Sequence, residues 1–110
     1  MVRSNMDRAE EIKLKYKRLR SEYGELYDEV LQILFRNDPI GINFEVNTDE
    51  YEPEVSTILL RLKEASSPEE LQNIIYQEFV RWFGADIAGS RAKYAKIAWE
   101  IWDAYKIHAV

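Results

Sequence analysis

The side chains best suited to acid–base or metal chemistry are carboxylates gathered in the middle of the chain. They fall between two apolar helical patterns, at Asp38, Glu45, Asp49, Glu50, Glu52 and Glu54. Carboxylates held close together attract Mg²⁺ or Ca²⁺, and their repulsion raises one pKa towards the range needed for proton transfer. Their spacing matches neither an EF-hand loop nor the Glu-x-x-His pairs of di-iron bundles. One hypothesis is nevertheless a carboxylate–metal enzyme built on Asp38, Asp49, Glu50 and Glu54.

The same carboxylates have two other interpretations. In the structural one, Asp38 caps the turn at Pro39 and Asp49 caps the next helix. The glutamates that follow then face the positive N-terminal end of that helix, where negative charge is favourable. In the other interpretation, the acidic segment is an exposed docking surface for a protein.

The aromatic residues near the C-terminus add one further candidate contact. Most of them fall on apolar helix faces and are expected in the core: Phe79, Trp82, Phe83, Trp102 and Tyr105. Trp99 lies roughly 60° off the stripe through Ile101 and Trp102, at about 100° per residue, so we expect it at an exposed edge used for self-association. The candidate interaction residues are therefore Asp38, Asp49, Glu50, Tyr51, Glu52, Glu54 and Trp99.

Several classes of chemistry lack the residues they need. Cysteine is absent and His108 is the only histidine, so neither a nucleophilic triad nor a zinc site is expected. The four glycines are isolated and form no phosphate-binding loop. We assign no residue to catalysis, to a metal or to a cofactor.

Composition predicts a single globular domain over residues 1–110. The chain has 46% hydrophobic and 32% charged residues, and a net charge of −5. A chain of this length buries roughly 65% of its unfolded surface, enough for one core without disulfides. The acidity is concentrated in residues 24–83, with 13 acidic and 4 basic side chains, whereas residues 1–23 have 7 basic and 4 acidic ones.

The basic N-terminal segment has two interpretations. Its lysines and arginines alternate with glutamates around a predicted helix, which is typical of a solvated face. It could instead meet the acidic middle of a neighbouring subunit. Nucleic acid is not an expected partner, because the chain is acidic overall and has no recognisable nucleic-acid motif.

Membrane association is not expected either. No apolar run approaches the roughly 20 residues that span a bilayer, and the N-terminus has no hydrophobic region for secretion. These features predict a cytoplasmic location.

Apolar spacing predicts a first helix over residues 5–36. The stripe keeps its register across Gly24, which favours one bent helix, with two helices as the alternative. Such a helix would be about 45–50 Å long, so its basic first half would overhang the core. Pro39 ends it.

The rest of the chain predicts an extended connector and three more helices. Alternating apolar positions over residues 40–47 indicate an extended segment lying on the helices, with strand pairing across a dimer as the less favoured alternative. Apolar stripes then predict helices over residues 53–62, 67–84 and 90–105, with a turn over 85–89. The fold class is all-α, a small antiparallel bundle of about four helices.

Residues 26–102 resemble a family of small uncharacterised bacterial proteins. The resemblance is carried by Asp38-Pro39-Ile40-Gly41, by Asp49-Glu50-Tyr51 and, less specifically, by Glu-Phe-Val-Arg-Trp-Phe-Gly at residues 78–84. It implies an all-helical fold and no established activity. The basic turns before Gly24 lie outside it.

Taken together, these patterns predict a helical protein that acts by protein–protein interaction and has no catalytic activity. Its partner is another protein or a second copy of the chain. Two alternatives stay open: a toxin-neutralising immunity protein whose acidic surface plugs a basic active site, and the carboxylate–metal enzyme.

Overall fold

The protein is all-α. The computed structural model describes residues 8–41 and 51–108, and within these ranges the chain forms six α-helices, two short 3-10 helices and no strand. The α-helices are α1 (Arg8–Tyr23), α2 (Glu25–Asn37), α3 (Glu52–Arg61), α4 (Pro68–Phe83), α5 (Ala85–Ala88) and α6 (Ala95–His108). The 3-10 helices are η1 (Leu62–Glu64) and η2 (Arg91–Tyr94). None of the helices in these ranges is long and apolar enough to cross a membrane.

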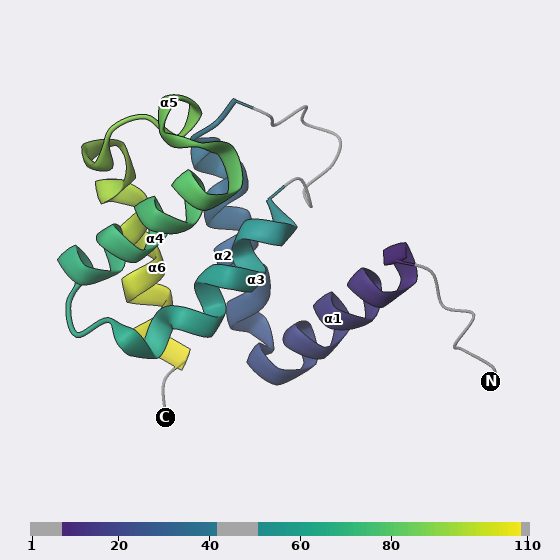
Figure 1. The fold of residues 1–110 in the computed structure, drawn as a ribbon. Coiled ribbons are helices and arrows are strands. Elements are labelled where there is room, and N and C mark those ends of the chain that lie inside the picture. Colours follow the sequence, from purple (N-terminus) through teal and green to yellow (C-terminus); the bar gives the residue numbers. More distant parts are fainter. Residues whose placement is uncertain (1–7, 42–50, 109–110) are drawn as a thin grey trace.

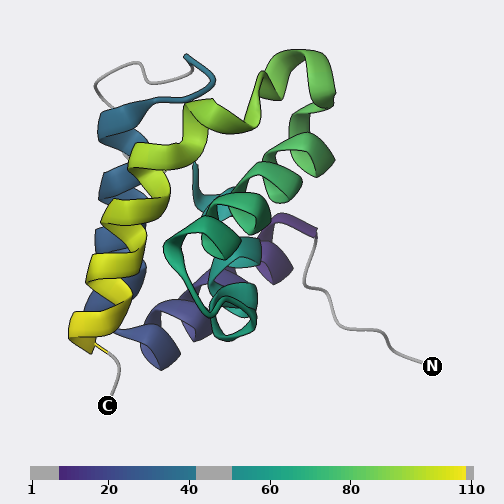
Figure 2. The ribbon, with the colours of Figure 1, turned by 90° about the vertical axis from the view of Figure 1, so that its left-hand side faces the viewer.

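One apolar core joins the helices. Helices α2 and α6 lie side by side, and α4 packs across α6 and against α3 (Figures 1 and 2). The buried side chains come from every helix, and those without exposed surface include Val30, Leu34, Ile58, Leu71, Phe79 and Ile101. The all-α prediction is confirmed, whereas the antiparallel order of the whole bundle stays a prediction.

Helix α4 begins and ends where the sequence predicts. The Ser67 hydroxyl accepts a hydrogen bond from the Glu70 backbone N–H (3.1 Å), and the Glu70 carboxylate accepts one from Ser66 N–H (2.6 Å). The first bond satisfies a donor that a helix N-terminus otherwise leaves open, and the second holds the residue before the cap against the first turn. Gly84, with φ of 84°, ends the helix and donates its N–H to Val80 O (2.7 Å).

The prediction of one bent helix over residues 5–36 is wrong, because the chain turns sharply at Gly24. Gly24 has φ of 59° and ψ of −133°, a combination that side-chain-bearing residues strongly avoid. It donates to Arg20 O (2.8 Å) and so ends α1, and its carbonyl accepts from Tyr27 N–H (3.1 Å) at the start of α2. The regular apolar spacing predicted a single helix because such spacing does not depend on the backbone angles of any one residue within it.

Replacing Gly24 with alanine is expected to destabilise the protein by about 1–3 kcal/mol, since a Cβ forces this backbone out of its native angles. A Cβ here would meet no neighbouring atom, so the cost is conformational and not steric packing. Urea unfolding measures it. The control is Ser21→Ala, an exposed position three residues earlier in α1, which should change stability by less than about 0.5 kcal/mol. Equal stability of the two variants would contradict the role of Gly24.

The C-terminal helices are also more divided than predicted. The expected turn over residues 85–89 contains the one-turn helix α5, and η2 precedes α6. Tyr94 fixes this region, because its buried hydroxyl donates to Ala88 O (2.6 Å). The described residues thus contain six α-helices where about four were expected. Of the connector predicted over residues 40–47, residues 42–47 lie outside the described ranges.

Helix α1 extends away from the other helices (Figure 1). Leu19 is its only buried residue, and Ile12 on the same apolar stripe is 42% exposed. Arg20 holds the C-terminal end of α1 in place through Asp28 (3.2 Å), Glu52 (3.3 Å) and the face of the Tyr27 ring. The basic N-terminal half of α1 therefore presents most of its surface to solvent.

Candidate functional site

Two of the predicted interaction residues, Asp38 and Tyr51, have structural roles. Tyr51 has no exposed surface, and its hydroxyl donates to Asp38 Oδ1 (2.7 Å) and accepts from Ile40 N–H (3.1 Å). Asp38 adopts the left-handed conformation that ends α2, donating its N–H to Leu34 O (2.8 Å). The pair joins the end of α2 to the start of α3. The prediction that Tyr51 is an exposed contact residue is therefore wrong.

Glu52 connects three helices. It accepts a short hydrogen bond from the Tyr27 hydroxyl and forms an ion pair with Arg20, and its side chain is 13% exposed. Burial raises the pKa of the Tyr27 phenol above its ordinary range, and the hydrogen bond to Glu52 raises it further. Glu52 thus fastens the first turn of α3 to α1 and α2 and offers little surface to a partner.

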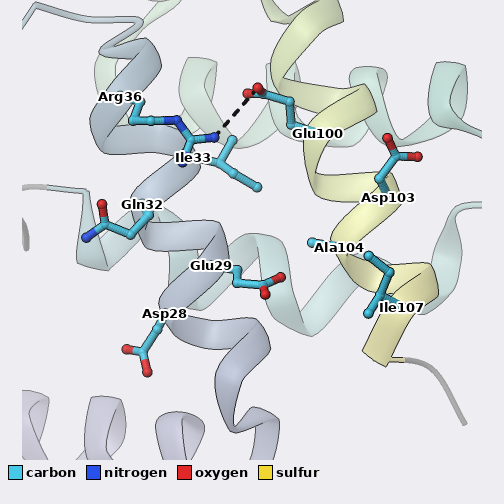
Figure 3. A pocket seen from close by; sticks show the side chains of 9 residues that line it. All are labelled: Asp28, Glu29, Gln32, Ile33, Arg36, Glu100, Asp103, Ala104 and Ile107. Atoms are coloured by element: carbon cyan, nitrogen blue, oxygen red, sulfur yellow. Dashed lines mark ion pairs between the residues drawn. The ribbon is translucent and has the colours of Figure 1, made fainter.

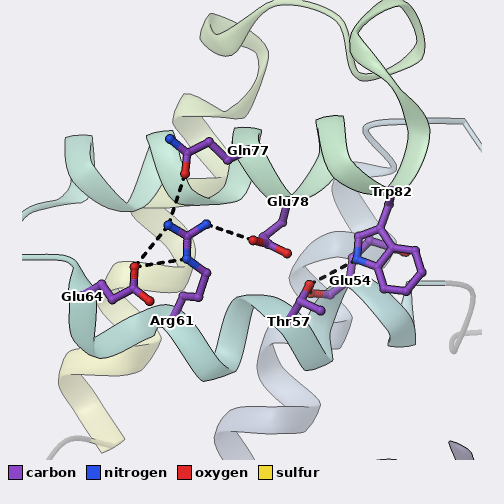
Figure 4. Close-up of polar contacts among 7 residues, drawn as sticks. All are labelled: Glu54, Thr57, Arg61, Glu64, Gln77, Glu78 and Trp82. Atoms are coloured by element: carbon purple, nitrogen blue, oxygen red, sulfur yellow. Dashed lines mark hydrogen bonds and ion pairs between the residues drawn. The ribbon is translucent and has the colours of Figure 1, made fainter.

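Glu54 contradicts the prediction of an exposed acidic surface most clearly. It is 2% exposed, and its Oε1 has no hydrogen-bond partner. Burial raises its pKa to about 7. It shares the α3–α4 junction with Thr57, whose hydroxyl accepts from Trp82 Nε1–H (3.2 Å) (Figure 4). The remaining two acidic candidates, Asp49 and Glu50, lie outside the described residues.

A second buried carboxylate in the same junction, Glu78, was not predicted from the sequence. Its side chain is 1% exposed and pairs with the Arg61 guanidinium at 2.9 Å (Figure 4). Arg61 also contacts Glu64 (3.1 Å) and Gln77 (3.1 Å). These contacts fix α3 against α4. Within the described ranges, no three acidic or histidine side chains lie close enough together to hold a metal ion.

A groove with a volume of about 590 Å³ lies between α2 and α6 (Figure 3). Ile33 and Ala104 are almost fully buried at its base, and Ile107 is 76% exposed at its side. Polar and charged side chains surround these apolar ones. The groove is lined by Asp28, Glu29, Gln32, Ile33, Arg36, Glu100, Asp103, Ala104 and Ile107.

The groove carries excess negative charge, with four carboxylates and one guanidinium in its lining. Arg36 and Glu100 form an ion pair across it (3.6 Å), and Glu100 also accepts from the Asn37 amide (2.7 Å). Glu29 lies 3.2 Å from His108, a contact that is ionic only when the imidazole is protonated. Asp103 has no ion-pair partner among the residues described. An apolar base with an acidic rim is suited to a partner with both apolar and basic side chains.

Trp99 continues this surface along α6. It is 52% exposed, which agrees with the edge position expected from its helical angle. Trp99, Asp103 and Ile107 are spaced four residues apart, so they follow one another along one side of the helix. Its use for self-association stays a prediction. Among the predicted interaction residues that the structure describes, Trp99 is the one that this spacing places beside the groove.

None of the residues that line the groove was predicted from the sequence as an interaction residue. The available signal was weak: Asp28, Glu29 and Gln32 flank the apolar stripe of α2, and Glu100 and Asp103 flank that of α6. Polar residues flank the apolar stripe of most amphipathic helices, so this pattern does not single out a site. Only the pairing of α2 with α6 brings the two rows together.

Comparison with models of known protein families, with curated proteins and with solved structures finds no match to this chain. The resemblance to the uncharacterised bacterial family therefore stays a prediction, and the groove has to be interpreted from its own chemistry.

Proposed function

We propose that this protein acts without catalysis, by binding a basic amphipathic helix of a protein partner in the groove between α2 and α6. The observation that carries the proposal is the combination of an apolar base, at Ile33, Ala104 and Ile107, with an acidic rim. Apolar contact supplies affinity, and the carboxylates select a basic partner and speed its approach. The exposed indole of Trp99 extends the apolar contact along α6.

The test uses a synthetic amphipathic helix of leucine and lysine about four turns long, and a matched peptide with glutamate in place of lysine. The lysine peptide is expected to bind and to shift the NMR signals of Ile33, Ala104 and Ile107, while the glutamate peptide is not. Asp103→Lys should weaken binding about five- to tenfold, because it replaces an attraction at the rim with a repulsion. Added salt should weaken binding too.

A charge reversal outside the groove provides the control. Glu69→Lys changes an exposed carboxylate in the first turn of α4, and it should leave affinity for the lysine peptide within about twofold. Binding that does not distinguish the two peptides, or that Asp103→Lys leaves unchanged, would contradict the proposal.

A toxin-neutralising role is a special form of the same proposal. It is supported by the acidic rim alone, which could oppose the basic active site of an enzyme acting on an anionic substrate. In that case the partner's activity would be lost on binding, and Asp103→Lys would restore it.

A further inference from the structure

Helix α1 carries a basic surface on the side opposite its packing contact. Leu14 is five residues from the buried Leu19, so it lies about 140° around the helix from it. Leu14 forms a shallow surface recess of about 330 Å³ together with Glu10, Lys13 and Lys17. Arg18 follows on the next turn. The half-buried Leu14 is therefore flanked by the exposed cations Lys13, Lys17 and Arg18, with Glu10 one turn before it.

The charge of this surface is opposite in sign to that of the groove between α2 and α6. Helix α1 has six basic and three acidic side chains, and the groove lining has one basic and four acidic ones. Lys13, Lys17 and Arg18 form no ion pair with any other described residue. Leu14 matches the apolar base of the groove, and the cations around it match the acidic rim.

The two surfaces are neighbours on the same molecule. Arg20 of α1 forms an ion pair with Asp28 of the groove lining (3.2 Å), so the basic helix adjoins the acidic groove. A surface with adjacent patches of opposite charge is complementary to itself after a two-fold rotation, because each patch then faces its opposite. Such contacts close at two copies and form two equivalent interfaces.

We propose that the occupant of the groove is α1 of a second copy of this chain, so that two chains form a closed dimer. Each α1 inserts Leu14 above Ile33 and Ala104 of its partner, and Lys13, Lys17 and Arg18 face the partner's carboxylates. This inference rests on the proposed function, since it names the helix that the groove binds.

Sedimentation of the 110-residue chain tests the dimer. At low salt and rising protein concentration, the sedimenting mass is expected to approach twice the 13.0 kDa of one chain, and salt should shift the equilibrium towards the monomer. Asp103→Lys and Lys17→Glu should each weaken self-association at least tenfold, because each places like charges together at both interfaces. Both positions are exposed, so the variants should fold normally, which circular dichroism can check.

Mixing the two variants gives the sharpest result. In a mixed dimer, one interface brings the native Lys17 to the native Asp103. The other interface brings together the two substituted positions, whose charges are both reversed. Opposite charges therefore meet at both interfaces, and dimers are expected to reappear. Glu69→Lys, in α4, should dimerise like the unaltered chain.

Three outcomes would overturn the inference: a monomer at every concentration, self-association that neither variant weakens, or no recovery on mixing. A monomer that still binds the leucine–lysine peptide would overturn the dimer alone and leave the proposed function standing.

Discussion

Replacing Glu54 with glutamine is expected to stabilise the protein by about 3 kcal/mol at pH 8 and to have almost no effect near pH 4. Glu54 is 2% exposed, and its Oε1 has no hydrogen bond to offset the loss of water around the charge. Glutamine keeps the size of the side chain and removes the charge. The gain therefore appears only where the native carboxyl group is ionised.

The pH range of this effect follows from the raised pKa of Glu54. Burial moves it from 4.5 to about 7, whereas in the unfolded chain it returns to its ordinary value. Below about pH 4.5 the Glu54 carboxyl group is protonated in both the folded and the unfolded state, so it imposes no charge-burial penalty on folding. Between about pH 4.5 and 7 the unfolded state loses the proton first, so stability falls as the pH rises. Above about pH 7 both states are ionised and the penalty is complete.

Urea unfolding at pH values from 4 to 8 checks this prediction. The free energy of unfolding of the unaltered chain should fall relative to that of Glu54→Gln across this range. Glu22→Gln, at an exposed position of α1, is the control, and its profile should stay parallel to that of the unaltered chain. A parallel profile for Glu54→Gln as well would show that Glu54 ionises as easily in the folded protein as in the unfolded one.

Replacing Glu78 with glutamine should have the opposite effect and destabilise the protein by about 2 kcal/mol at neutral pH. The Glu78 side chain is 1% exposed and its partner Arg61 is 27% exposed, with 2.9 Å between them. Removing one charge of a buried pair typically costs about 3–5 kcal/mol. Arg61 keeps contacts with water, Glu64 and Gln77, which reduces the expected loss.

Glu64→Gln is the matched control, because it removes the other carboxylate that pairs with Arg61. Glu64 is 52% exposed, and exposed ion pairs contribute about 1 kcal/mol or less. Denaturant unfolding of the two variants should therefore differ by more than about 1 kcal/mol. Equal losses would mean that the burial of Glu78 does not govern the strength of the pair.

Helix boundaries with strong local chemistry could be predicted from the sequence. The serine, proline and glutamate at residues 67–70 and the glycine at residue 84 satisfy or release backbone groups within one turn, so their effect needs no distant partner. Gly24 shows the limit of this approach. Glycine is tolerated inside a helix, and the packing of α1 and α2 determines whether it continues the helix or turns the chain.

The candidate site was much less predictable. Glu52 and Glu54 stand two residues apart in the first turn of α3, yet one forms an ion pair with α1 and the other is buried without a partner for Oε1. Neighbouring carboxylates in a helix point in different directions, and their surroundings come from helices distant in sequence. The described members of the acidic cluster, Asp38, Glu52 and Glu54, are therefore separated into different surroundings.

Composition, capping residues and apolar spacing by themselves determined that this protein is helical, where α4 begins and ends, and that Trp99 lies at an edge. These properties depend on the backbone and on neighbours within one or two turns. Tertiary structure alone decided that the chain turns at Gly24, that Glu54 and Glu78 are buried, and that carboxylates of α2 and α6 face a common groove. Each of these depends on contacts between helices, because burial and electric field at a side chain are set by whatever packs against it.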